Sequence, residues 1–245
     1  MIVYGFADFD KAFKCFEADA WAVHYDHHFD GGQRKEDFNR QFQAQEIAED
    51  VGFACMMLRD VVLDLSLRVQ NEMNPNSLAN RNPSQPLTSK ETSMQHTKMA
   101  VMMKYLIFSI RAYQDAVYKV GASVFGMKNG KGSTMKKAID ADKKVFQIGN
   151  PVAEIIKSQL PEYLDWYCEL REWRNLIKLG QGAGHGIRQD FVKQEVELTI
   201  RLSDRFNREK QIDLGLPYVS SALNMSAKLT QLFIKHGVQE KVFVK

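Results

Sequence analysis

Apolar side chains recur every three or four positions along two long stretches of the chain, the spacing that is typical of an amphipathic helix. The first stretch covers residues 38–74 and the second covers residues 97–125. The second is apolar on two sides, which predicts a helix that is buried on most of its surface. The pattern therefore places two long helices at the centre of the fold.

The segment between these helices, residues 75–95, contains three prolines and few apolar side chains. Pro75 is expected to end the first helix, because the residue before a proline is disfavoured in the helical region. Connections longer than about 12 to 15 residues are uncommon inside compact domains and are usually functional or disordered. We therefore expect a long mobile loop at 75–95.

A third helical pattern, over residues 160–178, carries charge on the side that should pack. Its apolar stripe contains Leu160, Tyr163, Leu164, Tyr167, Leu170 and Ile177. At about 3.6 residues per turn, Arg174 falls near the middle of this stripe and Arg171 at its edge. Because an unpaired guanidinium is costly to remove from water, Arg174 needs a carboxylate partner, a water-filled cleft or an anionic ligand.

Asp115 in the second long helix is the candidate carboxylate for Arg174 or for Arg171. Asp115 also follows Arg111 by four residues, a spacing at which two side chains meet on one helix face. The alternative is therefore an ordinary surface ion pair between Arg111 and Asp115.

The third helix runs into a glycine-rich segment that ends at His185. Gly180, Gly182 and Gly184 are expected to end the helix and to let the backbone turn tightly. Such a turn would bring Arg174 and His185 near one another.

After His185 the apolar spacing changes to strict alternation, which is typical of a half-buried strand. The alternating apolar residues are Val196, Leu198, Ile200 and Leu202, and a returning strand is expected at Ile212 and Leu214. Residues 218–236 return to helical spacing, with Gly237 as the expected end of that helix.

Two shorter helices are expected over residues 134–146 and from Pro151 onwards, because proline is favoured at the first helical position. Together these elements predict a mainly α fold, an antiparallel helical bundle with one small β-hairpin near the C-terminus. We expect a single domain over residues 1–245.

Residues 126–137 combine glycines with lysines, as phosphate-binding loops do. The Walker pattern requires a lysine directly before Ser or Thr, whereas Gly132 precedes Ser133 here and no strand leads into the segment. We interpret it as a helix connection with Ser133 as the N-cap of the next helix. The alternative is that its lysines contact a nucleic-acid backbone.

Composition narrows the class of protein. A chain of 245 residues with a formal charge of +3 permits RNA as a partner without demanding it. No apolar run reaches the roughly 18 residues of a membrane span, and the first 32 residues lack a signal-peptide pattern, so we expect no membrane association and a cytoplasmic protein. Cys15, Cys55 and Cys168 are scattered, which argues against disulfides and thiolate zinc sites.

A cluster of histidines near the N-terminus offers metal-ligand chemistry. His24, His27 and His28 occur with Asp26 and Asp30, and His24 and His28 would share one face of a helix. No HExxH pattern is present and no third ligand can be named. The alternative is a polar helix end with partly solvated histidines before a glycine turn.

The order of these features resembles the HEPN-like helical domains. A long helix, a loop, a buried helix with the sequence FSIRAYQDAVY, a helix with REWRN that runs into a Gly and His turn, a hairpin and a final helix follow one another. The resemblance implies an antiparallel helical bundle that is commonly dimeric. Many members are metal-independent endoribonucleases of defence and toxin systems, whereas others have lost activity and bind partners or nucleotides.

The family motif is an arginine, usually followed by Asn, Asp or His, with a histidine a short spacer further on. Arg174 and Asn175 match its start, but Leu179 or Gly180 occupies the histidine position, and His185 follows Asn175 only after nine further residues. A straight helix would hold Arg174 and His185 about 16 Å apart. A joint site therefore requires that the chain doubles back, or that a two-fold dimer pairs one subunit's His185 with the other's Arg174.

In the site that the resemblance implies, His185 transfers the proton, Arg174 stabilises the developing phosphorane charge and Asn175 orients the substrate. Arg171 and Asp115 are supporting residues, and no cofactor or metal is implied. The alternative is that Arg174 is structural and that His185 is merely exposed on a loop.

Two function classes follow from this resemblance. The first is a metal-independent endoribonuclease of a defence or stress system, and the second is a catalytically inactive dimeric helical module that binds nucleic acid or a protein partner. A metal-dependent enzyme that uses the histidine cluster is a third.

We expect a homodimer, because the aromatic residues of the third helix spread over more than one of its faces. These residues are Tyr163, Trp166, Tyr167 and Trp173. Trp166 and Trp173 are the residues expected at the dimer interface.

Overall fold

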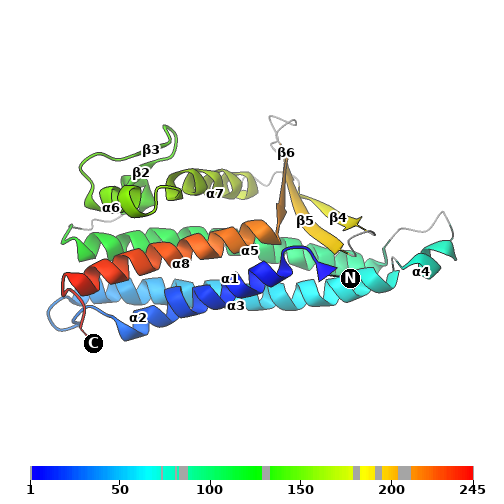
Figure 1. Cartoon of the computed structure of the whole chain (residues 1–245), viewed down its shortest axis with the longest axis horizontal. Helices are drawn as coiled ribbons and strands as arrows, with labels where there is room; N and C mark the ends of the chain where they lie inside the picture. The colour runs from blue at the N-terminus through cyan, green and yellow to red at the C-terminus, as the bar shows by residue number, and fades with distance from the viewer. Residues whose placement is uncertain are drawn as a thin grey trace.

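A computed structural model describes residues 2–72, 74–80, 82, 88–128, 133–178, 183–190, 195–203 and 211–244. The side chains of residues 2, 75, 78, 183–190, 202–203 and 211–213 lie outside this description. Figure 1 shows a long bundle of helices that carries a small sheet at one end. The elements in chain order are β1 (Ile2–Val3), α1 (Phe6–Phe16), the π-helix η1 (Glu17–Ala22), α2 (Val23–Asp26), α3 (Lys35–Glu72), α4 (Pro75–Ala79), α5 (Lys90–Val124), the 3-10 helix η2 (Met135–Lys137), β2 (Ile139–Asp140), β3 (Val145–Phe146), α6 (Pro151–Gln159), α7 (Tyr163–Lys178), β4 (Ala183–Asp190), β5 (Glu195–Ser203), β6 (Gln211–Gly215) and α8 (Leu216–Gln239).

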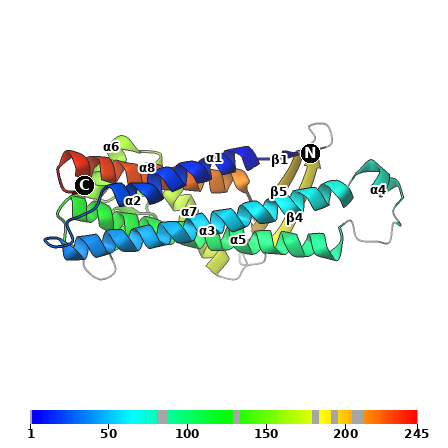
Figure 2. The same ribbon diagram turned by 90° about the horizontal axis from the view of Figure 1, so that it is seen from below.

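The two longest helices, α3 and α5, lie side by side along the length of the molecule (Figure 2). Polar contacts join them at both ends. At one end Thr92 Oγ1 donates to the Glu72 carboxylate at 2.7 Å, and at the other Ser123 Oγ donates to Asp37 Oδ1 at 2.6 Å. These contacts fix the antiparallel register of the pair, while the apolar side chains between them form the core.

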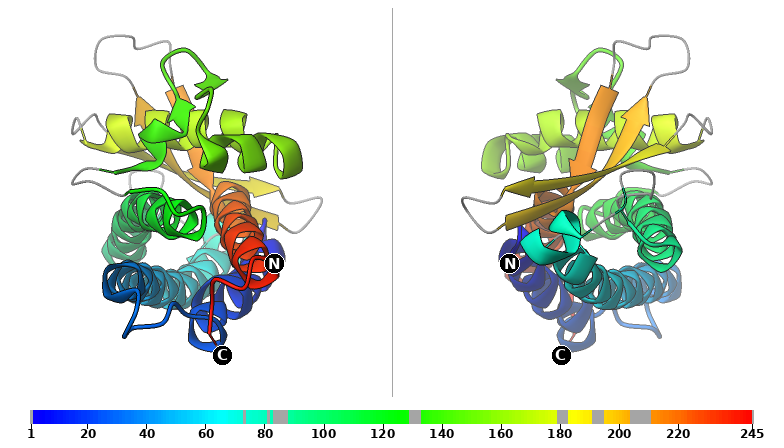
Figure 3. Two further views of the ribbon diagram at one scale, coloured as in Figure 1. Left: turned by 90° about the vertical axis from the view of Figure 1, so that its left-hand side faces the viewer. Right: turned by 90° about the vertical axis from the view of Figure 1, so that its right-hand side faces the viewer.

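Helices α1 and α8 complete the bundle, and α6 and α7 lie over one side of it (Figure 3). The approach of α8 to α5 depends on Gly121, because a Cβ atom there would lie 2.9 Å from the Phe233 ring. The prediction of a mainly α antiparallel bundle is confirmed.

The sheet is larger than the predicted hairpin. Strand β5 lies at its centre and pairs antiparallel with β6, so that Ile200 faces Leu214, as the alternating pattern predicted. Strand β4 adds a second antiparallel partner along the other edge of β5, and β1 pairs in parallel with the first residues of β5. The glycine-rich sequence of β4 has no alternating pattern, which is why the sequence did not reveal it.

The connection between the long helices is shorter than predicted. A short helix, α4, occupies Pro75–Ala79, and α5 begins at Lys90 rather than near residue 97. The cause is local, because Ser89 Oγ accepts the Thr92 N–H at 3.1 Å and the Glu72 carboxylate accepts the Ser89 N–H at 2.9 Å. Residues 81 and 83–87 of the predicted mobile loop lie outside the described residues.

The helix predicted over residues 134–146 is wrong. The chain there forms η2 and then the small hairpin β2–β3. The Asp140 carboxylate accepts the N–H groups of Asp142 and Lys143 at 3.1 and 3.2 Å, which closes a tight turn in place of a helix. Ser133 accepts from the Lys137 ammonium at 3.3 Å instead of capping a helix, whereas α6 begins at Pro151 as predicted and has Asn150 as its N-cap.

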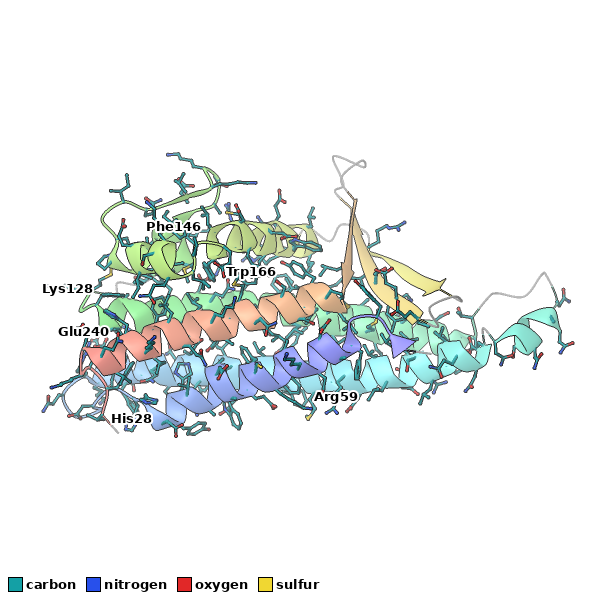
Figure 4. All side chains as sticks on the ribbon, in the orientation of Figure 1. His28, Arg59, Lys128, Phe146, Trp166 and Glu240 are labelled. Atoms are coloured by element: carbon teal, nitrogen blue, oxygen red, sulfur yellow. The ribbon has the colours of Figure 1, made fainter. Side chains whose placement is uncertain are left out.

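The aromatic side chains of α7 pack inside the molecule. Trp166 is 7% exposed and Trp173 is 3% exposed, and Figure 4 shows Trp166 between α7 and α8. Their assignment to a dimer interface was therefore wrong, because α7 is covered by α5 and α8 of its own chain. Among the described helices, none has an apolar stretch long enough to span a membrane.

A hydrogen-bonded network crosses the core around Tyr113. Its hydroxyl lies 2.7 Å from Thr230 Oγ1 and donates to the Ala20 carbonyl at 3.3 Å. His24 Nε2 lies 3.4 Å from the same hydroxyl, and His24 Nδ1 lies 3.4 Å from the Gln41 amide. Burial lowers the pKa of His24 to about 4, so the imidazole is neutral in the folded protein.

We expect the protein to lose stability in mild acid because of His24. The unfolded histidine has a pKa of about 6.5, so stability that is complete above that pH is lost as the pH falls towards 4. The loss should reach roughly 2 kcal/mol by pH 5. Urea melts at pH 7.5 and pH 5 should show a steeper loss for the wild type than for His24→Gln, and parallel losses would contradict the assignment.

Candidate functional site

Charge on α7 is divided between two sides of the helix. Arg171, Arg174 and Lys178 follow one another at helical spacing on one side, whereas Asp165, Glu169 and Glu172 occupy another. All three acidic side chains are exposed, and Arg171 and Arg174 are half-buried at the edge of the packed face. The basic side therefore forms a stripe, which we call the α7 basic stripe (Arg171, Arg174 and Lys178).

Arg174 has no carboxylate partner among the described residues, in contrast to Arg171 of the same stripe. Its Nη1 donates to Asn175 Oδ1 at 3.1 Å, and no described Asp or Glu lies within ion-pair distance of its guanidinium. Because the side chain is half-buried rather than enclosed, water can solvate the charge. The carboxylate partner that was one sequence alternative for Arg174 is therefore not found among the described residues, and the water-filled cleft and the anionic ligand stay predictions.

Arg171 is paired with Asp142 at the tip of the β2–β3 hairpin. Its two terminal nitrogens lie 2.6 and 3.3 Å from the two carboxylate oxygens. The Arg171 guanidinium lowers the pKa of Asp142 below its ordinary value by this hydrogen bond and by its charge. The prediction that Asp115 might pair with Arg171 is therefore wrong, because the hairpin supplies another carboxylate.

Asp115 pairs with Arg111 instead of Arg174. Arg111 Nη1 lies 2.6 Å from Asp115 Oδ1, a short ion pair that is not aligned as a hydrogen bond. Asp115 Oδ1 also accepts the Met135 N–H at 2.8 Å, which ties η2 to α5. The predicted pairing of Asp115 with Arg174 is contradicted, and the alternative Arg111–Asp115 pair joins a buried guanidinium to a carboxylate that is 28% exposed.

The Arg111 guanidinium also attaches α7 to α5. Arg111 Nη2 donates to the Tyr167 hydroxyl at 2.7 Å, and its central carbon lies 4.9 Å from the centroid of the Tyr167 ring. Burial raises the pKa of Tyr167 to about 12, so the hydroxyl remains protonated at neutral pH. This contact sets the position of α7 along α5 and so places the α7 basic stripe.

Two residues of α5 that the sequence analysis did not single out lie on the side of the helix that carries Arg111, whose guanidinium contacts α7. Lys104 and Phe108 precede Arg111 by seven and three residues and so share its helix face. Since α5 and α7 run antiparallel (Figure 1), Lys104 lies at the level of Arg174, about 10 Å along both helices from the Arg111–Tyr167 contact. The sequence does contain a signal for this arrangement, because Lys104, Phe108, Arg111 and Asp115 recur at helical spacing along one side of α5.

His185 lies in strand β4, opposite Ile200 of β5. Helix α7 ends at Lys178, so the straight continuation that would separate Arg174 and His185 does not occur. The expectation that His185 lies on a loop is wrong, because β5 provides a backbone partner for this segment. Its side chain, and the turn at residues 179–182, lie outside the described residues.

The histidine cluster does not have the geometry that its spacing indicated. Helix α2 ends at Asp26 and His27 is extended, so His24 and His28 do not share a helix face. His24 contacts Tyr113 and Gln41 in the core, whereas the His28 ring meets the Phe38 ring with centroids 6.1 Å apart. Within the described ranges, no group of three or more His, Cys, Asp or Glu residues could hold a metal ion.

Comparison with known proteins returned no matching family model, no matching curated sequence and no matching solved structure. The resemblance to HEPN-like domains therefore stays a prediction that rests on the order of elements and on Arg174 and Asn175.

We expect the two arginines to contribute differently to stability. Arg111→Ala removes a buried guanidinium together with its contacts to Asp115 and Tyr167, and should lower the free energy of unfolding by about 3 kcal/mol. Arg174→Ala should lower it by about 1 kcal/mol or less, as surface substitutions do. Urea melts of both variants provide the measurement, and equal losses would show that Arg174 is a structural residue.

Proposed function

We propose that this chain is a HEPN-like helical module that binds the phosphate backbone of RNA along α7. The observation that carries the proposal is the position of Arg174, half-buried on the α7 basic stripe without a carboxylate among the described residues. A guanidinium in such a position binds a phosphate through paired N–H donors. Asn175 holds its orientation from the adjacent position.

The surroundings of Arg174 favour a polyanion over a single small anion. Lys178 extends the stripe by one turn, and Lys104 of α5 lies at the same level as Arg174. Phe108 and Tyr105 on α5 are 36% and 45% exposed, and exposed aromatic rings beside basic groups are typical of surfaces on which bases stack. The acidic residues of α7 lie on its other side, where they do not repel a bound strand.

The second candidate function is metal-independent cleavage of the bound RNA, as the resemblance to HEPN-like ribonucleases implies. The observation that favours it is that the chain leaves α7 and enters β4, which carries His185, after a short connection. In this reaction the ribose 2'-oxygen attacks the neighbouring phosphorus and the bond to the 5'-oxygen breaks. His185 accepts the hydroxyl proton or donates one to the leaving oxygen, and Arg174 stabilises the charge on the phosphorane.

The proposal includes a homodimer and a role in defence or stress, as in the HEPN-like domains. Since Trp166 and Trp173 are buried, a dimer would have to form through other apolar side chains, and its interface is not assigned.

Arg174→Ala should weaken the binding of single-stranded RNA about tenfold, because a hydrogen-bonded charge is lost. The slope of log K against log salt concentration should fall by about 0.7, the value for one phosphate contact on a single strand. Fluorescence anisotropy of a labelled RNA over a range of salt concentrations provides both quantities. Lys157→Ala, which removes one positive charge from exposed α6, is the matched control and should bind as the wild type does.

If the site is a ribonuclease, the wild type should cleave single-stranded RNA in EDTA and leave DNA intact, since DNA lacks the 2'-hydroxyl nucleophile. His185→Ala should lower the rate by about 10²- to 10⁴-fold while RNA affinity stays within twofold of the wild-type value. Equal cleavage by both proteins would assign the activity to a contaminant. Binding without cleavage by either would leave RNA binding as the function.

A further inference from the structure

A second candidate surface lies on the side of the bundle opposite α7, where α1 and η1 run beside α3 (Figures 2 and 3). A hollow of about 370 Å³ opens between these elements. Phe13, Phe16 and Ala48 form its buried floor, and the more exposed Trp21, Phe53 and Met56 form its walls. Gly52 also lines it, and a Cβ atom at Gly52 would meet nothing within 4 Å. We call this hollow the α1–α3 groove.

The walls of the groove expose large apolar side chains to water. Phe53 is 59% exposed and Met56 is 45% exposed. A contiguous apolar surface of this kind marks an interaction site, and methionine adapts its shape to partner side chains. The apolar groove therefore provides a surface on which a partner could bury its own apolar side chains.

The polar edge of the groove is organised by Glu49. Its Oε1 accepts from Trp21 Nε1 at 3.2 Å and from the Tyr25 hydroxyl at 3.2 Å. These bonds hold the Trp21 ring against α3 and keep the carboxylate at the groove edge. Glu17, from the first turn of η1, lines the opposite side.

Around the central part of the groove, the charged side chains of Asp, Glu, Lys and Arg are all acidic. Neither residues 15–33 nor residues 41–58 contain a lysine or an arginine. The acidic residues that these segments place on η1, α2 and α3 are Glu17, Asp19, Asp26, Glu46, Glu49 and Asp50.

Basic side chains flank the α1 end of the groove, where α1 carries Lys11 and Lys14 and α3 carries Arg59. There Lys14 and Arg59 share the carboxylate of Asp10, at 2.7 and 3.2 Å. Figure 4 shows Arg59 on this face, away from α7. The shared Asp10 carboxylate offsets one of these two positive charges, and the acidic character of the groove lies in the central part, away from this end.

We propose that the α1–α3 groove binds a basic amphipathic helix of a partner protein. An apolar groove flanked by helices fits the apolar face of such a helix, and an acidic edge complements lysine and arginine on its polar face. The same charge disfavours RNA, so this surface is separate from the α7 basic stripe. The inference does not depend on the proposed RNA-binding function.

The test uses two fluorescein-labelled peptides of 18 residues with leucine along one helical face. One peptide has lysine at all other positions and the second has glutamate there. Anisotropy titrations with the wild type should give binding of the lysine peptide that is at least tenfold tighter than binding of the glutamate peptide. Equal affinities would overturn the proposal, because the acidic edge would then play no part.

Gly52 provides a variant that fills the groove without disturbing the fold. Gly52→Met should weaken binding of the lysine peptide at least tenfold, because the new side chain occupies open space in the groove. Gly52→Ala is the matched control and should bind within twofold of the wild type. Equal binding by Gly52→Met and Gly52→Ala would place the peptide elsewhere on the acidic surface and would overturn the proposal.

A second pair of variants tests the wall of the groove. Phe53→Ala should weaken binding about tenfold, whereas Leu67→Ala, on the same helix and equally exposed at 60%, should not. Light scattering on the same proteins separates a partner from a second copy of this chain. A wild-type dimer that becomes a monomer in Gly52→Met would assign the groove to self-association and overturn the proposal.

Discussion

The ion pair between the buried Arg111 guanidinium and the half-buried Asp115 carboxylate is the interaction on which the candidate site depends. The guanidinium is enclosed by the Asp115 carboxylate and the Tyr167 ring, and the same carboxylate accepts the backbone N–H of Met135. Through these contacts the pair attaches both α7 and η2 to α5. Because removing either partner would leave a charge in a poorly solvated place, the position of α7 is tightly determined. Arg174 is held at the edge of the packed face as a consequence.

The two sides of the molecule differ in charge far more than the net value of +3 suggests. Arg171, Arg174 and Lys178 lie on α7, whereas the acidic residues of η1 and α3 gather around the α1–α3 groove on the opposite side. A field of this kind attracts polyanions to one side and basic segments to the other. The same bundle can therefore present two surfaces that do not compete for a ligand.

The polar network of the core reaches the α1–α3 groove through the π-helix. Tyr113 donates to the Ala20 carbonyl within η1, and the next residue, Trp21, forms a wall of the groove. A π-helix is a rare backbone form that is often found at functional sites. Here a buried hydroxyl from α5 satisfies one of its carbonyls, which links packing in the core to the position of a surface side chain.

Local patterns in the sequence were enough to predict the mainly helical class, the two long helices, the hairpin of β5 with β6 and the start of α6 at Pro151, because each follows from apolar spacing or from the backbone preference of proline. They also identified Arg174 as a charge on a packing face. Only the tertiary structure decided which residue pairs with or packs against which. Asp115 pairs with Arg111, and Arg171 pairs with Asp142 of a hairpin that formed where a helix was predicted. Trp166 and Trp173 of α7 are buried in the core of their own chain. Strand β4 forms because β5 offers a free edge. The α7 basic stripe and the acidic edge of the α1–α3 groove each arise from segments far apart in the chain. Periodicity shows which side of a helix is buried, but what covers it depends on contacts between distant residues, which no local pattern contains.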